Sequence, residues 1–197
     1  MITSIVIVVI AYLLGSLSSA ILVCQFLKLP DPRTEGSKNP GANNVLRIGG
    51  KKAAILTLCG DLLKGFIPVF VALIMGLNEF TVSMVALAAV MGHLFPVFFN
   101  FEGGKGVATS LGVYFAFSIL AGVVAIVVWA IVALISRYAS LASLAAVTAA
   151  PIFIGIYSNP DFIIPCVAIA ALVFWKHWDN IQRLRNKTES KIDLKFG

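Results

Sequence analysis

Two glycine-bearing polar segments contain the residue types that bind anions in proteins. The first, residues 36–47, reads Gly-Ser-Lys-Asn-Pro-Gly-Ala-Asn-Asn-Val-Leu-Arg. Its glycines, proline and asparagines favour turns whose backbone N–H groups can point into one concavity. Ser37, Lys38 and Arg47 add side-chain donors, and an arginine can hold a phosphate through two parallel hydrogen bonds. A solvated turn before a helix has the same composition, so the residue types leave both interpretations open.

The second segment places Gly103, Gly104 and Gly106 around Lys105, directly before an apolar run. If that run begins a helix, its free N–H groups and its dipole favour an anion at this position. The segment is not a Walker A motif, because Gly106 stands where Ser or Thr should follow the Gly-Lys pair. A single glycine-rich loop is weak evidence. It gains weight if it lies on the same membrane face as residues 36–47.

Three titratable residues lie inside apolar runs, where charge is expensive. A charge at the centre of a bilayer costs ~2.5–3.5 kcal/mol on insertion scales, so it usually faces protein or water. Asp61 and Lys64 are three residues apart, and at this spacing they share one helix face and can neutralise each other. We interpret them as an internal ion pair that supports the first polar loop. A structural ion pair that holds helices together explains the spacing equally well. His93 fits a hydrogen-bonded packing residue.

Further polar residues stand where apolar runs end. His177 and Asn180 lie where the last run reaches the surface. This place suits substrate contact, and it also suits an interfacial anchor beside Trp178. Arg137 and Ser143 belong to another polar corner, where Arg137 could bind a ligand or simply extend its side chain to the interface.

The amino-acid composition indicates whether water or lipid surrounds the chain. Of 197 residues, 59% are hydrophobic and 12% are charged, whereas a soluble domain is typically about half apolar and a quarter charged. This excludes an ordinary water-soluble fold and intrinsic disorder. No internal repeat is visible, and the length suits a single domain, residues 1–197. We therefore expect an all-α polytopic membrane protein.

The charges indicate how the chain is oriented. Fifteen Lys and Arg against nine Asp and Glu give a net charge of +6. In a membrane chain the commoner cause of basic runs is the positive-inside rule, so we expect both basic stretches in the cytoplasm and no nucleic-acid partner. The three cysteines lie in apolar runs without a CxxC pair, which indicates neither a disulfide framework nor a metal site. Twelve of the fifteen cations lie in the first polar loop and the C-terminal tail: Lys28, Arg33, Lys38, Arg47, Lys51, Lys52, Lys176, Arg183, Arg185, Lys187, Lys191 and Lys195.

Six apolar runs define the expected spans: residues 3–26, 53–77, 80–101, 107–136, 141–157 and 161–176. If the run 107–136 crossed once, the basic tail would lie outside. As one helix this run would be ~45 Å long at ~1.5 Å per residue, longer than a ~30 Å hydrocarbon core. We therefore divide it into two short helices joined near residues 117–122. This predicts about seven transmembrane helices, with the N-terminus outside and the C-terminus cytoplasmic; the alternative is five or six spans with a re-entrant segment.

Read together, the polar blocks resemble one family in order and spacing. They are residues 36–47, Asp-Leu-Leu-Lys-Gly at 61–65, Gly-His-Leu-Phe-Pro-Val-Phe at 92–98 with Gly-Gly-Lys-Gly-Val-Ala-Thr at 103–109, and His-Trp-Asp-Asn-Ile-Gln-Arg-Leu at 177–184. These blocks resemble the bacterial acyl-phosphate-dependent glycerol-3-phosphate acyltransferases, the PlsY-type family, over essentially the whole chain. Two positions depart from the family pattern: Asn43 stands where Thr is frequent, and Glu102 where Lys is frequent.

The resemblance implies an enzyme of the bacterial plasma (inner) membrane with its active site facing the cytoplasm. It would move a fatty acyl group from acyl phosphate to the 1-hydroxyl of glycerol 3-phosphate and release lysophosphatidic acid and phosphate. Its partners would be these two substrates and the lipid bilayer, and we expect a monomer. Acyl phosphate already has a good leaving group, so neither an enzyme nucleophile nor a metal or other cofactor is demanded.

Our hypothesis for the mechanism is direct attack of the glycerol hydroxyl on the acyl carbonyl. The expected catalytic residues are Ser37, Arg47, Lys105, His177 and Asn180, with Asp61 and Lys64 as structural support. The expected substrate and phosphate contacts are Gly36, Lys38, Asn39, Gly41, Asn44, Gly103, Gly104, Gly106, Thr109 and Ser143.

A transporter for a phosphorylated solute is the alternative, since midplane charges and broken helices are also expected there. No repeated half is visible, and the phosphate-like loops are predicted on one membrane face. Both features favour an enzyme that works at the cytoplasmic interface.

Overall fold

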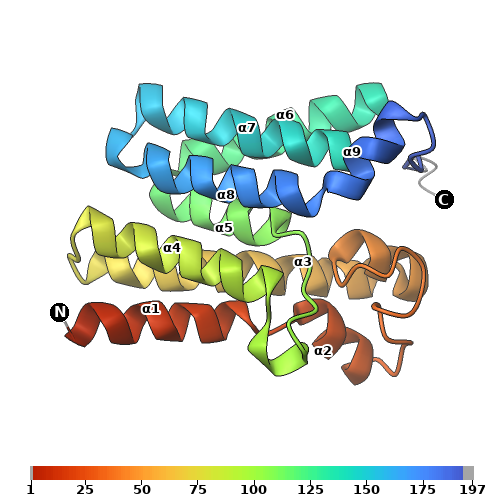
Figure 1. Cartoon of the computed structure of the whole chain (residues 1–197), viewed down its shortest axis with the longest axis horizontal. Helices are drawn as coiled ribbons and strands as arrows, with labels where there is room; N and C mark the ends of the chain where they lie inside the picture. Colours follow the sequence, from red (N-terminus) through yellow and green to blue (C-terminus); the bar gives the residue numbers. More distant parts are fainter. Residues whose placement is uncertain (1, 193–197) are drawn as a thin grey trace.

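The computed structural model of the chain describes residues 2–192, and within that range every regular element is a helix. Lys195, counted above with the basic tail, lies outside the described residues. Figure 1 shows the longer helices running back and forth, roughly parallel to the horizontal long axis of the molecule. In chain order they are α1 (Ile2–Gly15), α2 (Ser19–Phe26), α3 (Ala42–Ile74), α4 (Glu79–Leu94), η1 (Val97–Phe99), α5 (Val107–Phe117), α6 (Ile119–Ser136), α7 (Ala139–Tyr157), η2 (Pro160–Phe162), α8 (Ile163–Lys176) and α9 (Trp178–Arg185).

The expectation of an all-helical multi-pass membrane protein is confirmed. Four stretches, α3, α4 with η1, α6 and α7, are long and apolar enough to cross a bilayer. The pair α1–α2 is bent by 46° and the pair η2/α8–α9 by 61°, which raises the number to six if each bent pair is one span. Helix α5 is apolar but has only 11 residues. The seven-span count and the orientation of the termini stay predictions.

The predicted division of the run 107–136 is confirmed. Helix α5 ends at Phe117 and α6 begins at Ile119, with Ser118 between them in an extended conformation. The Ser118 hydroxyl accepts a hydrogen bond from the N–H of Ala121 at 3.4 Å, so it caps the new helix. The run is therefore two antiparallel helices joined by a one-residue turn.

Close packing between α3 and α5 depends on two glycines. A Cβ on Gly65 would overlap the carbonyl oxygen of Thr109, and a Cβ on Gly112 would overlap that of Leu62. Small residues let helix backbones approach in this way, which strengthens van der Waals contact where burial in lipid supplies little driving force. The apolar core lies mainly among α4, α5, α7 and α8, with Tyr114 as its largest fully buried side chain.

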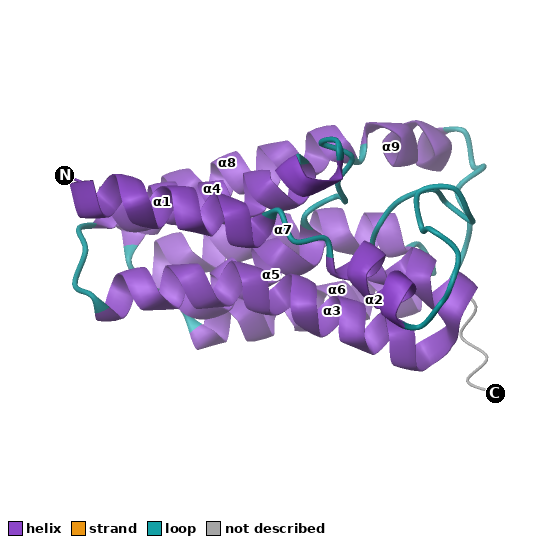
Figure 2. Ribbon diagram, turned by 90° about the horizontal axis from the view of Figure 1, so that it is seen from below, coloured by secondary structure: helices purple, strands orange, loops and turns teal. Residues whose placement is uncertain are grey.

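The up-and-down arrangement separates the loops into two ends. Residues 27–41, 95–106, 137–138 and 186–192 lie at one end, and the turns at 75–78, 118 and 158–162 lie at the other (Figures 1 and 2). Both proposed anion-binding segments and the described part of the basic tail are thus at the first end, the polar end of the bundle. This is the arrangement that the two proposed anion-binding segments require.

Candidate active site

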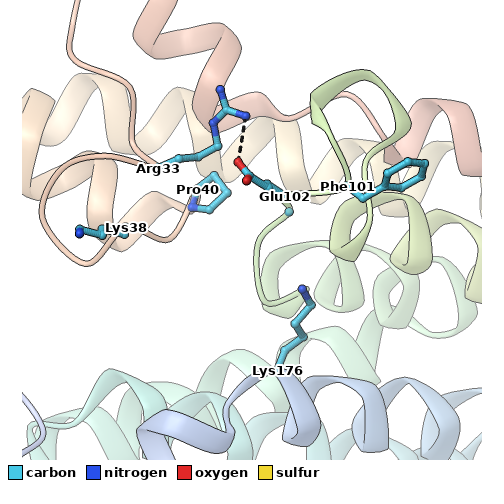
Figure 3. A pocket seen from close by; sticks show the side chains of 7 residues that line it. Arg33, Lys38, Pro40, Phe101, Glu102 and Lys176 are labelled. Carbon is cyan, nitrogen blue, oxygen red and sulfur yellow. Dashed lines mark hydrogen bonds and ion pairs between the residues drawn. The ribbon is translucent and has the colours of Figure 1, made fainter.

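The two glycine-bearing segments lie side by side at the polar end. Arg33 of the first loop forms an ion pair with Glu102 at 3.3 Å (Figure 3). A Cβ on Gly104 would lie 2.9 Å from the carbonyl oxygen of Pro40, so the two backbones are in contact. The N–H of Gly104 donates to the carbonyl of His93 at 3.2 Å. The second segment is therefore folded back between the end of α4 and the first loop.

The first loop is held in shape by the buried side chain of Asn44. Its Oδ1 accepts from the N–H of Ser37 at 2.8 Å, and its Nδ2 donates to the carbonyls of Pro32 at 2.8 Å and Glu35 at 2.9 Å. Gly36 has φ +61°, and a Cβ there would overlap Asn44 Oδ1. Asn44 therefore supports the shape of the first loop. Substrate contact by Asn44 stays a prediction.

The side-chain donors of the first loop are exposed. Ser37, Lys38 and Arg47 all face solvent, and Arg47 Nη2 donates to the hydroxyl of Ser190 at 3.2 Å. Asn39 and Gly41 form the turn that begins α3: the Asn39 carbonyl accepts from the N–H of Gly41 at 2.9 Å. The backbone of this segment is ordered while its charged groups remain free to meet a ligand.

Lys105 reaches across to α9, where its ammonium donates to Oδ1 of Asn180. The Nδ2 of Asn180 donates to Glu189 Oε1 at 2.6 Å. The same carboxylate accepts from Ser140 Oγ and from Arg183 Nε, both at 2.7 Å. Because an ionised carboxylate only accepts hydrogen bonds, it holds the Asn180 amide with its nitrogen toward Glu189 and its oxygen toward Lys105.

Burial and neighbouring charges set the protonation of this network. Burial lowers the pKa of Lys105, and nearby Arg183 lowers it further, against the opposing effect of Glu189 and Asp179. Burial raises the pKa of Glu189, but hydrogen bonds from Asn180, Ser140 and Arg183 outweigh this and hold it below its ordinary value. The carboxylate is therefore ionised at neutral pH.

His177 is buried at the junction of α8 and α9, three residues before Asn180. Its Nδ1 lies 2.8 Å from the carbonyl oxygen of Val173. A carbonyl only accepts, so Nδ1 carries the hydrogen and Nε2 is the nitrogen left for another partner. The ring is thus oriented by the helix that precedes it.

Two residues predicted to contact substrate lie between packed helices. Ser143 Oγ donates to the Ala139 carbonyl at 2.8 Å and accepts from Trp129 Nε1 at 3.1 Å, which ties α7 to α6. Thr109 is fully buried, with its backbone against Gly65. Gly106 caps the start of α5 with φ +86°. Substrate binding by these residues stays a prediction.

The buried residues Asp61 and Lys64 form an ion pair with an N–O distance of 2.8 Å. Lys64 also donates to the carbonyl of Leu17 at 2.8 Å, in the break between α1 and α2. The pair therefore joins α3 to the α1–α2 bend. Support of the first loop by the pair stays a prediction.

An open cavity of about 400 Å³ lies between the loops and the end of α8. In Figure 3 the Lys176 side chain points from α8 toward the Glu102 segment across this space. Its ammonium lies 4.6 Å from the centre of the Phe95 ring, a cation–π distance. The lining combines three cations with one carboxylate: Arg33, Lys38, Pro40, Phe101, Glu102, Gly103 and Lys176.

Sequence reasoning did not name the tail residue Glu189 or the cavity residues Arg33 and Lys176 as parts of the site. Glu189 is the sole acidic residue between Arg183 and Ile192, which was the only available signal. Its partner Ser140 is 49 residues away along the chain. Arg33 and Lys176 were counted only as orienting charges.

Comparisons with known proteins agree with one another. A family model described as glycerol-3-phosphate acyltransferase matches residues 5–187. A glycerol-3-phosphate acyltransferase of Coxiella burnetii is 50% identical over 187 residues, covering 95% of this chain and 97% of that protein. One from Thioalkalivibrio sulfidiphilus is 52% identical over 186 residues, covering 94% and 92%.

Two solved structures are similar over nearly the whole chain. One is a crystal structure of PlsY (YgiH), an integral membrane glycerol 3-phosphate acyltransferase, in its glycerol 3-phosphate form. It has a TM-score of 0.93 and 39% identity, and the match covers 97% of this chain and 96% of that one. The other is the lysophosphatidic acid form of the same protein, with a TM-score of 0.91 and 37% identity over the same shares.

Proposed function

Because the chain belongs to the glycerol-3-phosphate acyltransferase family, we propose that it transfers a fatty acyl group from acyl phosphate to the 1-hydroxyl of glycerol 3-phosphate. One observation carries the proposal: contacts link donors from three separate segments at the polar end. Lys105 donates to Asn180, Asn180 donates to Glu189, and the adjacent Ser190 accepts from Arg47. Two phosphate-bearing substrates need this convergence of donors.

The exposed donors and Lys105 bind the phosphate of the acyl phosphate. Ser37, Lys38 and Arg47 supply side-chain donors, and the N-terminus of α5 behind Gly106 supplies free N–H groups. Positive charge here stabilises the electron density that builds up on the departing phosphate and on the carbonyl oxygen. The cavity beside Lys38 and Gly103 leaves room for such an anion.

The buried pair His177 and Asn180 orients glycerol 3-phosphate. His177 Nε2 accepts a hydrogen bond from a glycerol hydroxyl, and the Asn180 amide lies next to Lys105. The hydroxyl oxygen attacks the acyl carbon, the new ester C–O bond forms, and the C–O bond to phosphate breaks. The hydroxyl proton ends on the released phosphate, so the products are lysophosphatidic acid and inorganic phosphate.

The bilayer supplies the environment for the acyl chain. Exposed apolar side chains cover the helices of the bundle, as expected for contact with lipid. The basic loops and tail favour the cytoplasmic face of the bacterial plasma membrane for the polar end, where glycerol 3-phosphate is dissolved. The enzyme acts there as a monomer without metal or other cofactor.

The test is an assay of the purified protein with palmitoyl phosphate, palmitoyl-CoA and palmitoyl-carrier protein side by side. We expect phosphate release and lysophosphatidic acid only with palmitoyl phosphate, and only when glycerol 3-phosphate is present. Activity with palmitoyl-CoA instead would overturn the choice of donor. Uptake of labelled glycerol 3-phosphate into proteoliposomes without phosphate release would favour a transporter.

A further inference from the structure

Three titratable side chains are buried beneath the glycine-rich segment, and the mechanism above uses none of them. Asp61 and Lys64 lie on α3 with 2% and 8% of their surface exposed, and His93 lies in the last turn of α4 with 6% exposed. Groups of this kind remain in an apolar interior only when they compensate one another. Their arrangement therefore shows what each of them holds in place.

Contacts on α3 and with the α1–α2 bend hold this trio together. Lys64 Nζ lies 2.8 Å from Asp61 Oδ1 and donates to the Leu17 carbonyl at 2.8 Å. His93 Nδ1 lies 3.5 Å from the same Oδ1, a polar contact longer than an ordinary hydrogen bond. The carboxylate thus attracts one edge of the His93 ring and leaves the other edge, Nε2, pointing away from α3.

The Nε2 edge of His93 meets Gly104. A Cβ on Gly104 would overlap His93 Nε2, so the ring rests against the backbone of the segment. The carbonyl of His93 also accepts the N–H of Gly104 at 3.2 Å. On its other side Gly104 touches the carbonyl of Pro40. Lys105 follows directly, so the position of Gly104 determines where the Lys105 side chain begins.

We propose that Asp61 and Lys64 fix the orientation of the His93 ring, and that the ring positions Gly104 and hence Lys105 for phosphate binding. The three are positioning residues, because they act through the backbone of the segment. This inference rests on the proposed function, since Lys105 is there assigned to the acyl phosphate. It also explains why position 104 has glycine without a positive φ: the ring edge occupies the place of a Cβ.

The test is a neutral double variant, Asp61→Asn with Lys64→Met, which leaves no unpaired buried charge. The matched control is Thr57→Val on the same helix, whose hydroxyl donates only to the Ala53 carbonyl one turn before it. We expect the KM for palmitoyl phosphate to rise about 10-fold in the double variant, since a displaced Lys105 binds phosphate less well. The control should keep the parent KM. A smaller folded fraction would lower kcat and leave KM unchanged.

Two outcomes overturn the inference: an unchanged KM and kcat, or a lower kcat with an unchanged KM. Either result, with an active parent protein, leaves the proposed function intact, whereas an inactive parent protein refutes the proposed function instead. If the double variant does not fold, the inference is tested by measuring the activity of His93→Ala, Gly104→Ala and the variant that combines them. Removing the His93 ring makes room for the methyl group that Gly104→Ala adds. The loss of activity in the combined variant should therefore be about 10-fold smaller than the product of the two single losses. Independent effects of the two substitutions would refute the contact.

Discussion

The two halves of the candidate site differ in how much of their geometry exists before substrate arrives. In one half, Lys105, His177 and Asn180 are at least partly buried and are held by hydrogen bonds to α8 and the tail. In the other half, Ser37 and Arg47 are exposed. Ordering an exposed arginine costs side-chain entropy when substrate binds. The side chains of the buried half lost this entropy when the protein folded. We infer that the buried half orients the substrate and that the exposed half captures the anion.

The contrast concerns side chains and does not extend to the backbone. Asn44 holds the first loop with three hydrogen bonds, and the ion pair between Arg33 and Glu102 links that loop to the second segment. Glu102 departs from the family pattern described above, and here its carboxylate partly offsets the charge of Arg33 instead of adding a cation beside Lys105. In the capture half, a loop with a fixed backbone thus carries exposed charged side chains.

The largest effect should come from removing the cation that joins the halves. Lys105→Ala should lower kcat/KM for palmitoyl phosphate by about 100-fold or more, with losses in both kcat and KM, because the charge binds the phosphate and stabilises the transition state. Steady-state assays of the purified variant measure this loss. A near-normal kcat/KM would remove Lys105 from the site and end the distinction between the halves.

Arg47→Ala should lower kcat/KM about 100-fold as well, but with a larger share of the loss in KM, because Arg47 is exposed and acts in capture. The matched control is Ser190→Ala, which removes only the exposed partner of Arg47 and should change kcat/KM about twofold or less. If the Arg47→Ala loss fell entirely on kcat, the assignment of capture to this half would be wrong.

Glu189→Gln should reduce kcat about 10-fold, since a glutamine can turn its NH2 toward the NH2 of Asn180 and release the fixed amide. The thermal unfolding temperature in detergent, measured beside kcat, separates this effect from loss of fold. Equal kcat in the variant and the parent would show that the Asn180 orientation does not depend on the tail.

The smallest effect at neutral pH should come from Lys105→Arg, and the difference should grow with alkalinity. Burial lowers the pKa of Lys105, so its charge is lost at a lower pH than that of an ordinary lysine. Activity should therefore fall on the alkaline side, and the arginine variant should keep its activity to higher pH, because a guanidinium stays protonated. Superimposable pH profiles would mean that the Lys105 charge does not limit the rate.

Local patterns account for what could be predicted. The break near residues 117–122 follows from helix length against bilayer thickness, and the structure places it at Ser118. The pairing of Asp61 with Lys64 follows from their spacing of three on one helix. Neither prediction needed the position of any other helix. The contacts of Asn44 inside the loop were missed because its partners are backbone groups, which carry no side-chain signal.

The amino-acid sequence by itself determined the membrane environment, the helices and the sets of polar residues that gather at one end, because apolar length, glycine spacing and charge are local properties. Only the tertiary structure decided which donors are held and which are free. Lys105 meets Asn180 across 75 residues, and Ser140 meets Glu189 across 49. Such contacts depend on how the helices pack and where the tail returns, and no local pattern specifies that.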